Sequence, residues 1–208
     1  DVSGWEAADW YAPPGVEPKV ERLSWGRQSW FPFWAAEHRA VRDNVGLIDM
    51  SFMSKFLVQG RDAAAALERL SANRVSGIDG RITYTQWLND DGRLEADLTV
   101  TQIDGERFLV VATDTAHRHV QAWMRRRFPP DAHVFVSDMS GAWAQLNLQG
   151  PRSRDIFLST LGPDDPFRAT LLDMKRNQIA HGVWMGYDLW LSRTGYTGEP
   201  MAFEIFAH

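Results

Sequence analysis

Asp97 is a carboxylate in the middle of a segment that otherwise favours a β-strand. The segment YTQWLNDDGRLEADLTV, residues 84–100, alternates apolar and polar residues on both sides of an Asp-Asp-Gly turn. Period-two alternation puts Asp97 on one strand face with Glu95 and Thr99. On a wet face Asp97 is an ordinary surface group, whereas in a cavity it can stabilise a cation or accept a proton. A hairpin would bring Tyr84 close to Asp97.

The glycine-rich segment RTGYTGE, residues 193–199, is the second candidate for chemistry. Gly195 and Gly198 bracket Tyr196 and Thr197, which permits a tight bend and a close backbone approach. An exposed tyrosine at such a bend is typical of ligand recognition. By itself this loop remains a weak indication of a site.

Composition disfavours metal and thiol chemistry. The chain has no cysteine, which excludes disulfides, thiolate zinc sites and cysteine catalysis. His117 and His119 are two positions apart on an expected helix and therefore face different ways, so they are poor joint ligands. We expect no metal site.

Charge and hydropathy disfavour nucleic-acid and membrane partners. The net charge is −5, and the arginines at 125–127 stand at an expected helix end, where a solvated face is more usual. No run of apolar residues is long enough to span a membrane, and the start of the chain does not read as a signal peptide. The expected location is the cytoplasm, or the mitochondrial matrix in a eukaryote.

The elements that must position these residues alternate between helices and antiparallel strands. Helices are expected at 32–45, 61–73, 115–128 and 150–162, the last with Pro151 just inside its start. Strands are expected at 53–60, 81–88, 93–103, 106–113, 133–139 and 143–150, with two more around a Gly-rich loop in 181–206. Turns are marked by Asp79-Gly80, Asp91-Gly92 and Asp104-Gly105. This pattern predicts an α+β fold with antiparallel sheets and packed helices.

The first 30 residues differ from the rest of the chain. Five tryptophans fall within the first 34 residues, alongside the segment APPGVEPK, which cannot be a regular helix. Residues 1–30 are predicted to be an aromatic-rich arm or linker, and residues 31–208 a single domain. The arm either lays its aromatic rings onto the core or presents them to another domain. The chain begins without methionine and stops inside an apolar strand, so we expect it to be part of a longer protein.

Four segments, in order and at similar spacing, resemble the folate-dependent aminomethyltransferase family, whose type member is the T-protein of the glycine cleavage system. They are GLIDMSFMSKFLVQG (46–60), YTQWLNDDGRLEADLTV (84–100), LNLQGPRS (146–153) and SRTGYTGEPMAFEI (192–205). The chain looks most similar to the folate domain fused to flavin-dependent dimethylglycine or sarcosine dehydrogenases. The resemblance implies the T-protein folate-binding fold with its C-terminal part missing.

The resemblance also implies a chemistry. Tetrahydrofolate would accept a one-carbon unit from an aminomethyl donor or a small N-methyl amine, giving 5,10-methylenetetrahydrofolate. A flavin domain upstream of this chain would be the partner, and FAD would bind there because the chain itself has no dinucleotide fingerprint. A stand-alone aminomethyltransferase is the alternative within the enzyme class, and a non-catalytic folate-binding module is the alternative outside it.

Five residues match functional positions of the family. Asp97 matches the catalytic aspartate, and Tyr84 and Tyr196 match tyrosines of the folate site. Glu204 matches the glutamate that ends the family's GFE motif, and a carboxylate there can accept paired hydrogen bonds from a pterin. Met53 matches an apolar contact, for which core packing is an equally good interpretation.

The chain departs from the family pattern at three places. Arg93 replaces a glycine before the aspartate, and Ala112 replaces an asparagine. One additional residue separates Tyr196 from Glu204, which leaves Glu199 as an alternative pterin carboxylate.

Overall fold

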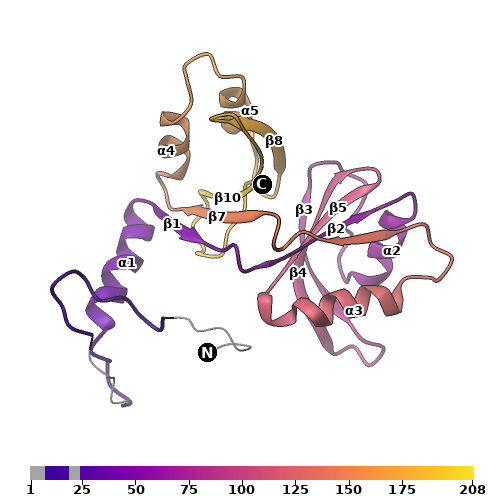
Figure 1. The fold of residues 1–208 in the computed structure, drawn as a ribbon, viewed down its shortest axis with the longest axis horizontal. Coiled ribbons are helices and arrows are strands. Elements are labelled where there is room, and N and C mark those ends of the chain that lie inside the picture. The colour runs from indigo at the N-terminus through magenta and orange to yellow at the C-terminus, as the bar shows by residue number, and fades with distance from the viewer. Residues whose placement is uncertain (1–7, 19–23) are drawn as a thin grey trace.

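The chain forms two five-stranded antiparallel sheets in the computed structural model, which describes residues 8–18 and 24–208 (Figure 1). Sheet I has the strand order β3-β4-β5-β2-β6. Its strands are β2 (Ser54–Gln59), β3 (Ile82–Leu88), β4 (Leu94–Asp104), β5 (Arg107–Ala112) and β6 (Phe135–Asp138). Sheet II has the order β1-β7-β10-β9-β8. Its strands are β1 (Gly46–Asp49), β7 (Ala144–Gln149), β8 (Ile179–Trp184), β9 (Tyr187–Ser192) and β10 (Ala202–Ala207).

Helices cover the outer face of each sheet. Sheet I packs against α2 (Ala63–Leu70) and α3 (His117–Arg127), which follows the single 3₁₀ turn η1 (Asp114–Ala116). Sheet II packs against α4 (Ser153–Ser159) and α5 (Phe167–Asp173). The helix α1 (Phe31–Asp43) precedes β1. Among the described residues, no helix is both long and apolar enough to cross a membrane.

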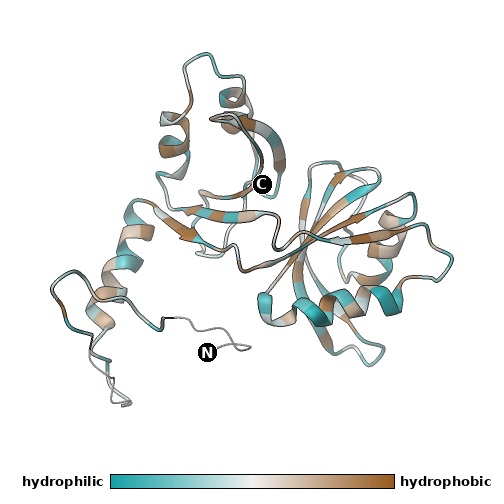
Figure 2. Cartoon of the chain, in the orientation of Figure 1, coloured by the Kyte–Doolittle hydropathy of each residue, from teal (hydrophilic) through white to brown (hydrophobic). Residues whose placement is uncertain are grey.

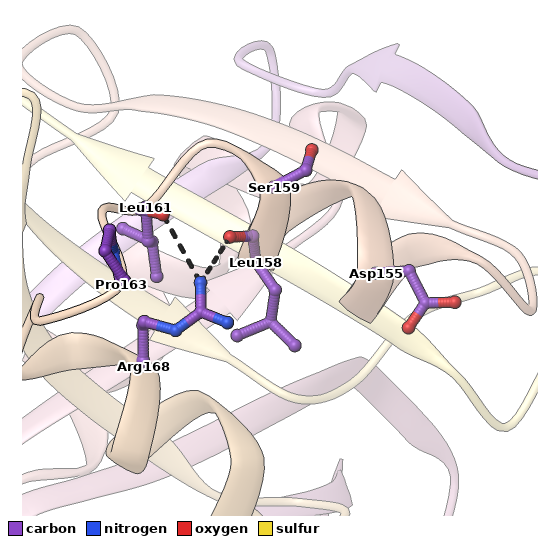
Figure 3. A pocket seen from close by; sticks show the side chains of 6 residues that line it. All are labelled: Asp155, Leu158, Ser159, Leu161, Pro163 and Arg168. Atoms are coloured by element: carbon purple, nitrogen blue, oxygen red, sulfur yellow. Dashed lines mark hydrogen bonds between the residues drawn. The ribbon is translucent and has the colours of Figure 1, made fainter.

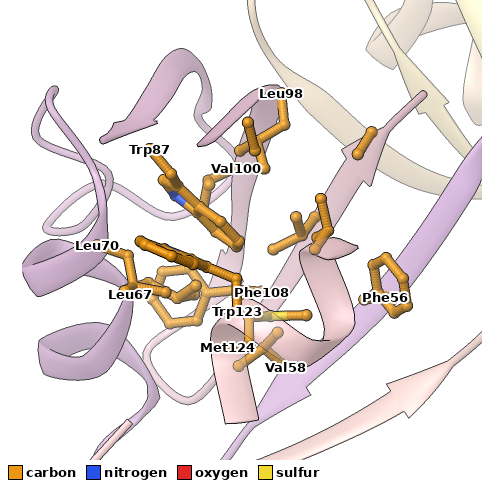
Figure 4. Close-up of a cluster of buried hydrophobic side chains, with 14 of the residues drawn as sticks. Phe56, Val58, Leu67, Leu70, Trp87, Leu98, Val100, Phe108, Trp123 and Met124 are labelled. Atoms are coloured by element: carbon orange, nitrogen blue, oxygen red, sulfur yellow. The ribbon is translucent and has the colours of Figure 1, made fainter. Parts of the chain in front are cut away.

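The period-two pattern of the strands decides which side chains each helix layer buries. In sheet I, every second residue of β4 (Ala96, Leu98, Val100) joins Trp87, Trp123 and Met124 in a cluster under α2 and α3 (Figure 4). Along β7, hydrophobic and hydrophilic residues alternate in the same way (Figure 2), and Leu148 faces the cluster under α4 and α5. The other residues of these strands therefore point to the inner faces of the sheets.

The two sheets are joined through their inner faces. Met53, Ile82 and Val111 of the sheet I side form one buried cluster with Ile179 and Phe206 of sheet II. Backbone hydrogen bonds reinforce this junction, since the Ile82 amide donates to the Asn177 carbonyl at 2.9 Å. Residues next to this cluster are consequently positioned by both sheets.

Most expected elements are present, and the chain is an α+β protein of antiparallel sheets as predicted. The strand β1 and the helix α5 were not predicted, and two further details were wrong. The segment 181–206 contains parts of three strands, because β8 and β9 are separated by a tight turn at Met185 and Gly186 before the glycine-rich loop. Pro151 lies outside its helix, since α4 begins at Ser153 with Arg152 as the N-cap residue.

In the described part of the N-terminal arm, an aromatic ring contacts α1, and further aromatic contacts lie inside α1 itself. Trp10 stacks on Phe33 with ring centroids 5.8 Å apart, and Trp34 stacks on His38. The helix α1 has no buried residue among those described, and Trp25 is fully exposed. Packing of aromatic rings onto the core, one of the two interpretations, is thus not seen for these residues, while Trp5 lies outside the described residues. The start of α1 at Phe31 coincides with the expected boundary at 30, but the domain division stays a prediction.

Candidate functional site

Asp97 and Tyr84 are paired on the inner face of sheet I. In the register of β3 and β4, Asp97 lies opposite Gln86, and Tyr84 lies opposite Thr99. The Tyr84 hydroxyl reaches diagonally across and donates to Asp97 Oδ2 at 2.9 Å. This bond is the main cause of a raised pKa at Tyr84, because the protonated phenol is the donor. Both side chains are exposed, so the Asp97 carboxylate is oriented by a neighbour and remains accessible.

Tyr196 brings sheet II residues into the same site. It lies in the loop between β9 and β10 and keeps 59% of its surface exposed. Its phenol pKa is nevertheless raised, first by burial of the hydroxyl and then by the nearby groups Glu204, Asp97 and Tyr84. The Tyr196 side chain is thus exposed to solvent along part of its ring, while its hydroxyl group lies among protein atoms. Three of the other predicted site residues, Glu204, Asp97 and Tyr84, therefore lie within electrostatic reach of Tyr196.

Glu204 is a buried carboxylate on the inner face of sheet II. Only 4% of its surface is exposed. Gln145 Nε2 and Asn147 Nδ2, both from β7, each donate to Glu204 Oε1 at 3.4 Å, a long distance for such a bond. Burial raises the pKa of Glu204 to about 7, although the two amide donors act to lower it. The structure thus places a carboxyl group that titrates near neutrality beside two amides.

The loop carrying Tyr196 is seated on β7 through Gln149. The Thr197 hydroxyl donates to Gln149 Oε1 at 3.2 Å. Gly195 lies so close to the Gln149 amide that a Cβ at this position would overlap it. A side chain at position 195 would therefore have to displace the Gln149 amide, the group that links this loop to β7.

Met53 and Lys55 lie at the edge of the site, next to the crossing from β1 to β2. Met53 is buried in the cluster that joins the sheets, which accounts for the residue by packing. Lys55, which was not predicted, is fully buried, and its Nζ donates to the carbonyls of Ser51 and Met53 at 3.0 and 2.7 Å. Burial lowers its pKa, while Asp138 and Asp49 act to raise it. Lys55 holds the 51–53 backbone in place, and a role for Met53 in ligand contact stays a prediction.

The three departures from the family pattern are explained in part by geometry. Arg93 has no positive φ, so its backbone does not need glycine, and Gly92 alone adopts the left-handed conformation, with φ +74°. Ala112 is buried in the cluster under α3, on the face opposite to Asp97. The backbone amide of Glu199 contacts Thr197, whereas Glu204 is the carboxylate that acts on Tyr196. Of the two candidates for the pterin carboxylate, this geometry favours Glu204 over Glu199.

The described contacts of the two histidines weighed as metal ligands include none of the predicted site residues, and neither does the lining of a surface pocket. His117 contacts Ser54 and Asp138, and His119 contacts Glu95. Within the described ranges no three His, Cys, Asp or Glu side chains are grouped to hold a metal ion. The pocket, of about 430 Å³, lies between α4 and α5, where Arg168 is bonded to the carbonyls of Leu158 and Leu161 (Figure 3). None of the predicted site residues lines that pocket.

Gln145 and Asn147 were not predicted as site residues. Their strand, AQLNLQ, was predicted only as a strand, although it carries polar residues at every second position, a pattern that indicates a polar face. Sequence alone gives no reason for that face to be buried, because polar strand faces are usually wet. The relevant signal was three amide side chains in one short strand, since amides are the neutral groups that can be buried beside a carboxylate.

The fold and the site describe a class of α+β proteins in which two antiparallel sheets, joined by a buried apolar cluster, bring together tyrosines and carboxyl groups from both sheets. The whole chain, residues 1–208, matches the GCVT N-terminal domain family, and it belongs to that family. This confirms the resemblance read from the four sequence segments.

Curated relatives and solved structures support the same assignment. The chain is 35% identical over 165 residues to 4-methylaminobutanoate oxidase (formaldehyde-forming) of Paenarthrobacter nicotinovorans, which covers 79% of this chain and 20% of that protein. It is 32% identical over 171 residues to an aminomethyltransferase of Exiguobacterium sibiricum, covering 82% of this chain and 45% of that one. The glycine cleavage system aminomethyltransferase T of Bartonella henselae superposes with a TM-score of 0.69 at 25% identity, covering 82% of this chain and 44% of that one.

A heterotetrameric sarcosine oxidase from Corynebacterium sp. U-96 shares the fold, with a TM-score of 0.57 at 16% identity over 88% of this chain and 87% of that one. The chain spans from one fifth to about half of the length of the curated relatives it matches.

Proposed function

We propose that this chain carries out tetrahydrofolate-dependent one-carbon transfer, as the folate domain of an N-methyl amine dehydrogenase or oxidase of the dimethylglycine or sarcosine type. The observation that carries the proposal is the coupling of Tyr196 to Glu204 on sheet II and to Asp97 and Tyr84 on sheet I. An accessible carboxylate and a buried carboxyl group thus both lie within electrostatic reach of Tyr196.

The residues present fit a reduced pterin. Its amino group and ring N–H groups form an edge rich in donors, and Glu204 is an acceptor flanked by two amide oxygens without a hydrogen bond. Tyr84 and Tyr196 offer aromatic surface on the exposed side of the site. We therefore assign Glu204 to hold the pterin edge, Tyr84 and Tyr196 to line the ring, and Met53 to an apolar contact.

Tetrahydrofolate, when bound, supplies a nucleophilic nitrogen that takes up the one-carbon unit, with 5,10-methylenetetrahydrofolate as the product. Asp97 is assigned to stabilise positive charge on the incoming carbon–nitrogen group and to accept a proton. Tyr84 is a positioning residue, because its hydroxyl fixes the orientation of Asp97 Oδ2. A carboxylate held in one orientation needs less reorganisation when charge develops.

The oxidase relative supports the flavin-coupled context. It is named for forming formaldehyde from a methylamino compound, and a small N-methyl amine is the donor that we propose for this chain. A flavin domain would be a separate partner, and FAD is assigned to it, not to this chain. The expected compartment is the cytoplasm, or the mitochondrial matrix in a eukaryote.

One alternative has specific support. The 32% identity to an aminomethyltransferase favours a stand-alone enzyme that receives an aminomethyl group. A folate-binding module without catalysis stays the alternative outside the enzyme class, but Ala112 lies on the face of sheet I opposite to Asp97 and lends it no support. Flavin-dependent demethylase activity in the natural protein would favour our proposal over a stand-alone aminomethyltransferase. Folate-dependent one-carbon transfer would favour our proposal over a folate-binding module without catalysis.

Calorimetric titration with tetrahydrofolate tests the proposal. The natural protein that carries these 208 residues should bind with a single site, and Glu204→Ala should weaken binding by roughly 100-fold because a charged hydrogen-bond acceptor is lost. Glu199→Ala is the matched control and should bind as the unmodified protein does. Absence of binding by the unmodified protein contradicts the proposed function and both of its folate-dependent alternatives.

A further inference from the structure

The buried polar cluster on sheet II has more acceptors than donors. Gln145 Oε1 and Asn147 Oδ1 are shut off from solvent and have no hydrogen-bond partner. Both side chains are buried, with exposed fractions of 0% and 2%. Their amide N–H groups are directed to Glu204 Oε1, and their carbonyl oxygens are left without a donor. A buried acceptor without a donor is unfavourable, so this arrangement is short of N–H or O–H groups.

Two sources can supply the missing donors. One is a proton on Glu204, since a carboxylic acid donates to a neighbouring amide oxygen. The other is a ligand with several N–H groups along one edge. The two sources exclude each other, because a ligand that donates to Glu204 requires the carboxylate form.

We propose that Gln145 and Asn147 act with Glu204 as a proton-linked selector for a planar ring edge rich in N–H donors, such as that of a reduced pterin. Filling this selector expels one proton from the Glu204 carboxyl group to the buffer. The inference rests on the proposed function, because it names further residues of the same site. Gln145 and Asn147 are its positioning and specificity-determining residues.

The groups that face Glu204 leave the carboxyl as the centre of this exchange. Gln145 and Asn147 on β7 and Ser192 on β9 are neutral neighbours in the strand register. Tyr196 is an ionisable group within electrostatic reach of Glu204, and its raised pKa keeps it protonated near neutrality. Asp97 and Tyr84 act on Tyr196 from the opposite sheet. The Glu204 pKa of about 7 sets the pH range in which ligand binding and proton release are linked.

The experiment is calorimetric titration of the natural protein with tetrahydrofolate in two buffers of different ionisation enthalpy. At a pH of about 6 we expect release of close to one proton per ligand and roughly tenfold weaker binding than at a pH of about 8, where release is small. Glu204→Gln should abolish proton release at both values. Asn147→Leu and Gln145→Leu should each weaken binding roughly tenfold and extend proton release to higher pH, because each removes a donor to the carboxylate.

A second measurement follows Glu204 without any ligand. Infrared difference spectra between the unmodified protein and Glu204→Gln should show a carboxylic acid band that disappears near neutral pH, and Asn147→Leu should shift its disappearance upward. Gln121→Leu, on the helix covering the outer face of sheet I, is the matched control and should change neither readout.

The outcomes separate this inference from the proposed function. No binding of tetrahydrofolate by the unmodified protein overturns both. Tight binding with no proton release at a pH of about 6, or release that Asn147→Leu and Gln145→Leu leave unchanged, overturns the selector alone.

Discussion

At the scale of single residues, the site contrasts two carboxyl groups in opposite surroundings. Asp97 is exposed and receives a hydrogen bond from Tyr84 at 2.9 Å, whereas Glu204 is buried beside two amides. Environment, not residue type, separates a group suited to charge stabilisation from one suited to ligand selection. Sequence reasoning found both carboxyl groups, Asp97 from its position in the strand pattern and Glu204 only through the family resemblance.

Tyr84→Phe tests the orientation of Asp97. Because Tyr84 is exposed, the free energy of unfolding should stay close to that of the unmodified protein. The turnover rate of one-carbon transfer should fall by roughly tenfold, with a small change in the Michaelis constant for tetrahydrofolate. A variant that loses affinity and keeps its turnover rate would show that Tyr84 contributes to binding and not to orientation.

Glu204→Gln tests the burial of the carboxyl group through the pH dependence of stability. The folded-state pKa of about 7 is above the ordinary value of 4.5, so ionisation destabilises the folded protein. The stability that this group contributes is complete below about pH 4.5 and is lost as the pH rises through 7. In urea unfolding, the free energy of unfolding of the variant should increase relative to that of the unmodified protein by up to about 3 kcal/mol between pH 5 and 8. An equal difference at both pH values would contradict the raised pKa.

At the scale of elements, the sequence predicted strands well where turns carried a familiar signal. Gly80 and Gly92 follow aspartates in the expected turns and both have positive φ. The β8–β9 turn was missed because Met185 has φ +50° and Gly186 has φ +86°, a conformation that usually selects Asn-Gly. With methionine at the first position, the segment reads as one continuous strand.

Met185→Asn tests this explanation. Asparagine tolerates the left-handed conformation better than methionine, so the variant should be more stable by about 0.5–1 kcal/mol in urea unfolding. Met185→Ala keeps the Cβ strain and should give no such gain. Loss of stability in Met185→Asn would mean that the methionine side chain makes a contribution larger than the strain.

At the scale of the whole molecule, function depends on how the sheets are held against each other. Period-two patterns predicted which residues share a strand face, but they carry no information about which face of sheet II meets which face of sheet I. The inner cluster of Met53, Ile82, Val111, Ile179 and Phe206 joins segments far apart in sequence. This is why Gln145 and Asn147 could be placed on a polar face from the sequence but not inside a site.

Phe206→Ala and Phe203→Ala form a matched pair that tests the role of the inner cluster. The two residues lie on opposite faces of β10, Phe206 between the sheets and Phe203 under α4 and α5. Each variant should lose about 3–5 kcal/mol of stability in urea unfolding. At a temperature where both remain folded, Phe206→Ala should bind tetrahydrofolate at least roughly tenfold more weakly than Phe203→Ala. Equal affinities would show that the junction between the sheets does not set the site.

The central claim is that Asp97 is the catalytic carboxylate of a folate site between two sheets. The most direct measurement compares Asp97→Asn with the unmodified protein in tetrahydrofolate binding and in folate-dependent trapping of formaldehyde equivalents. We predict binding within roughly threefold and a loss of trapping of at least about 100-fold, because the charge that stabilises the cation is removed. Asp91→Asn, in the turn of the same hairpin, should leave both unchanged. Unchanged trapping by Asp97→Asn would contradict the claim.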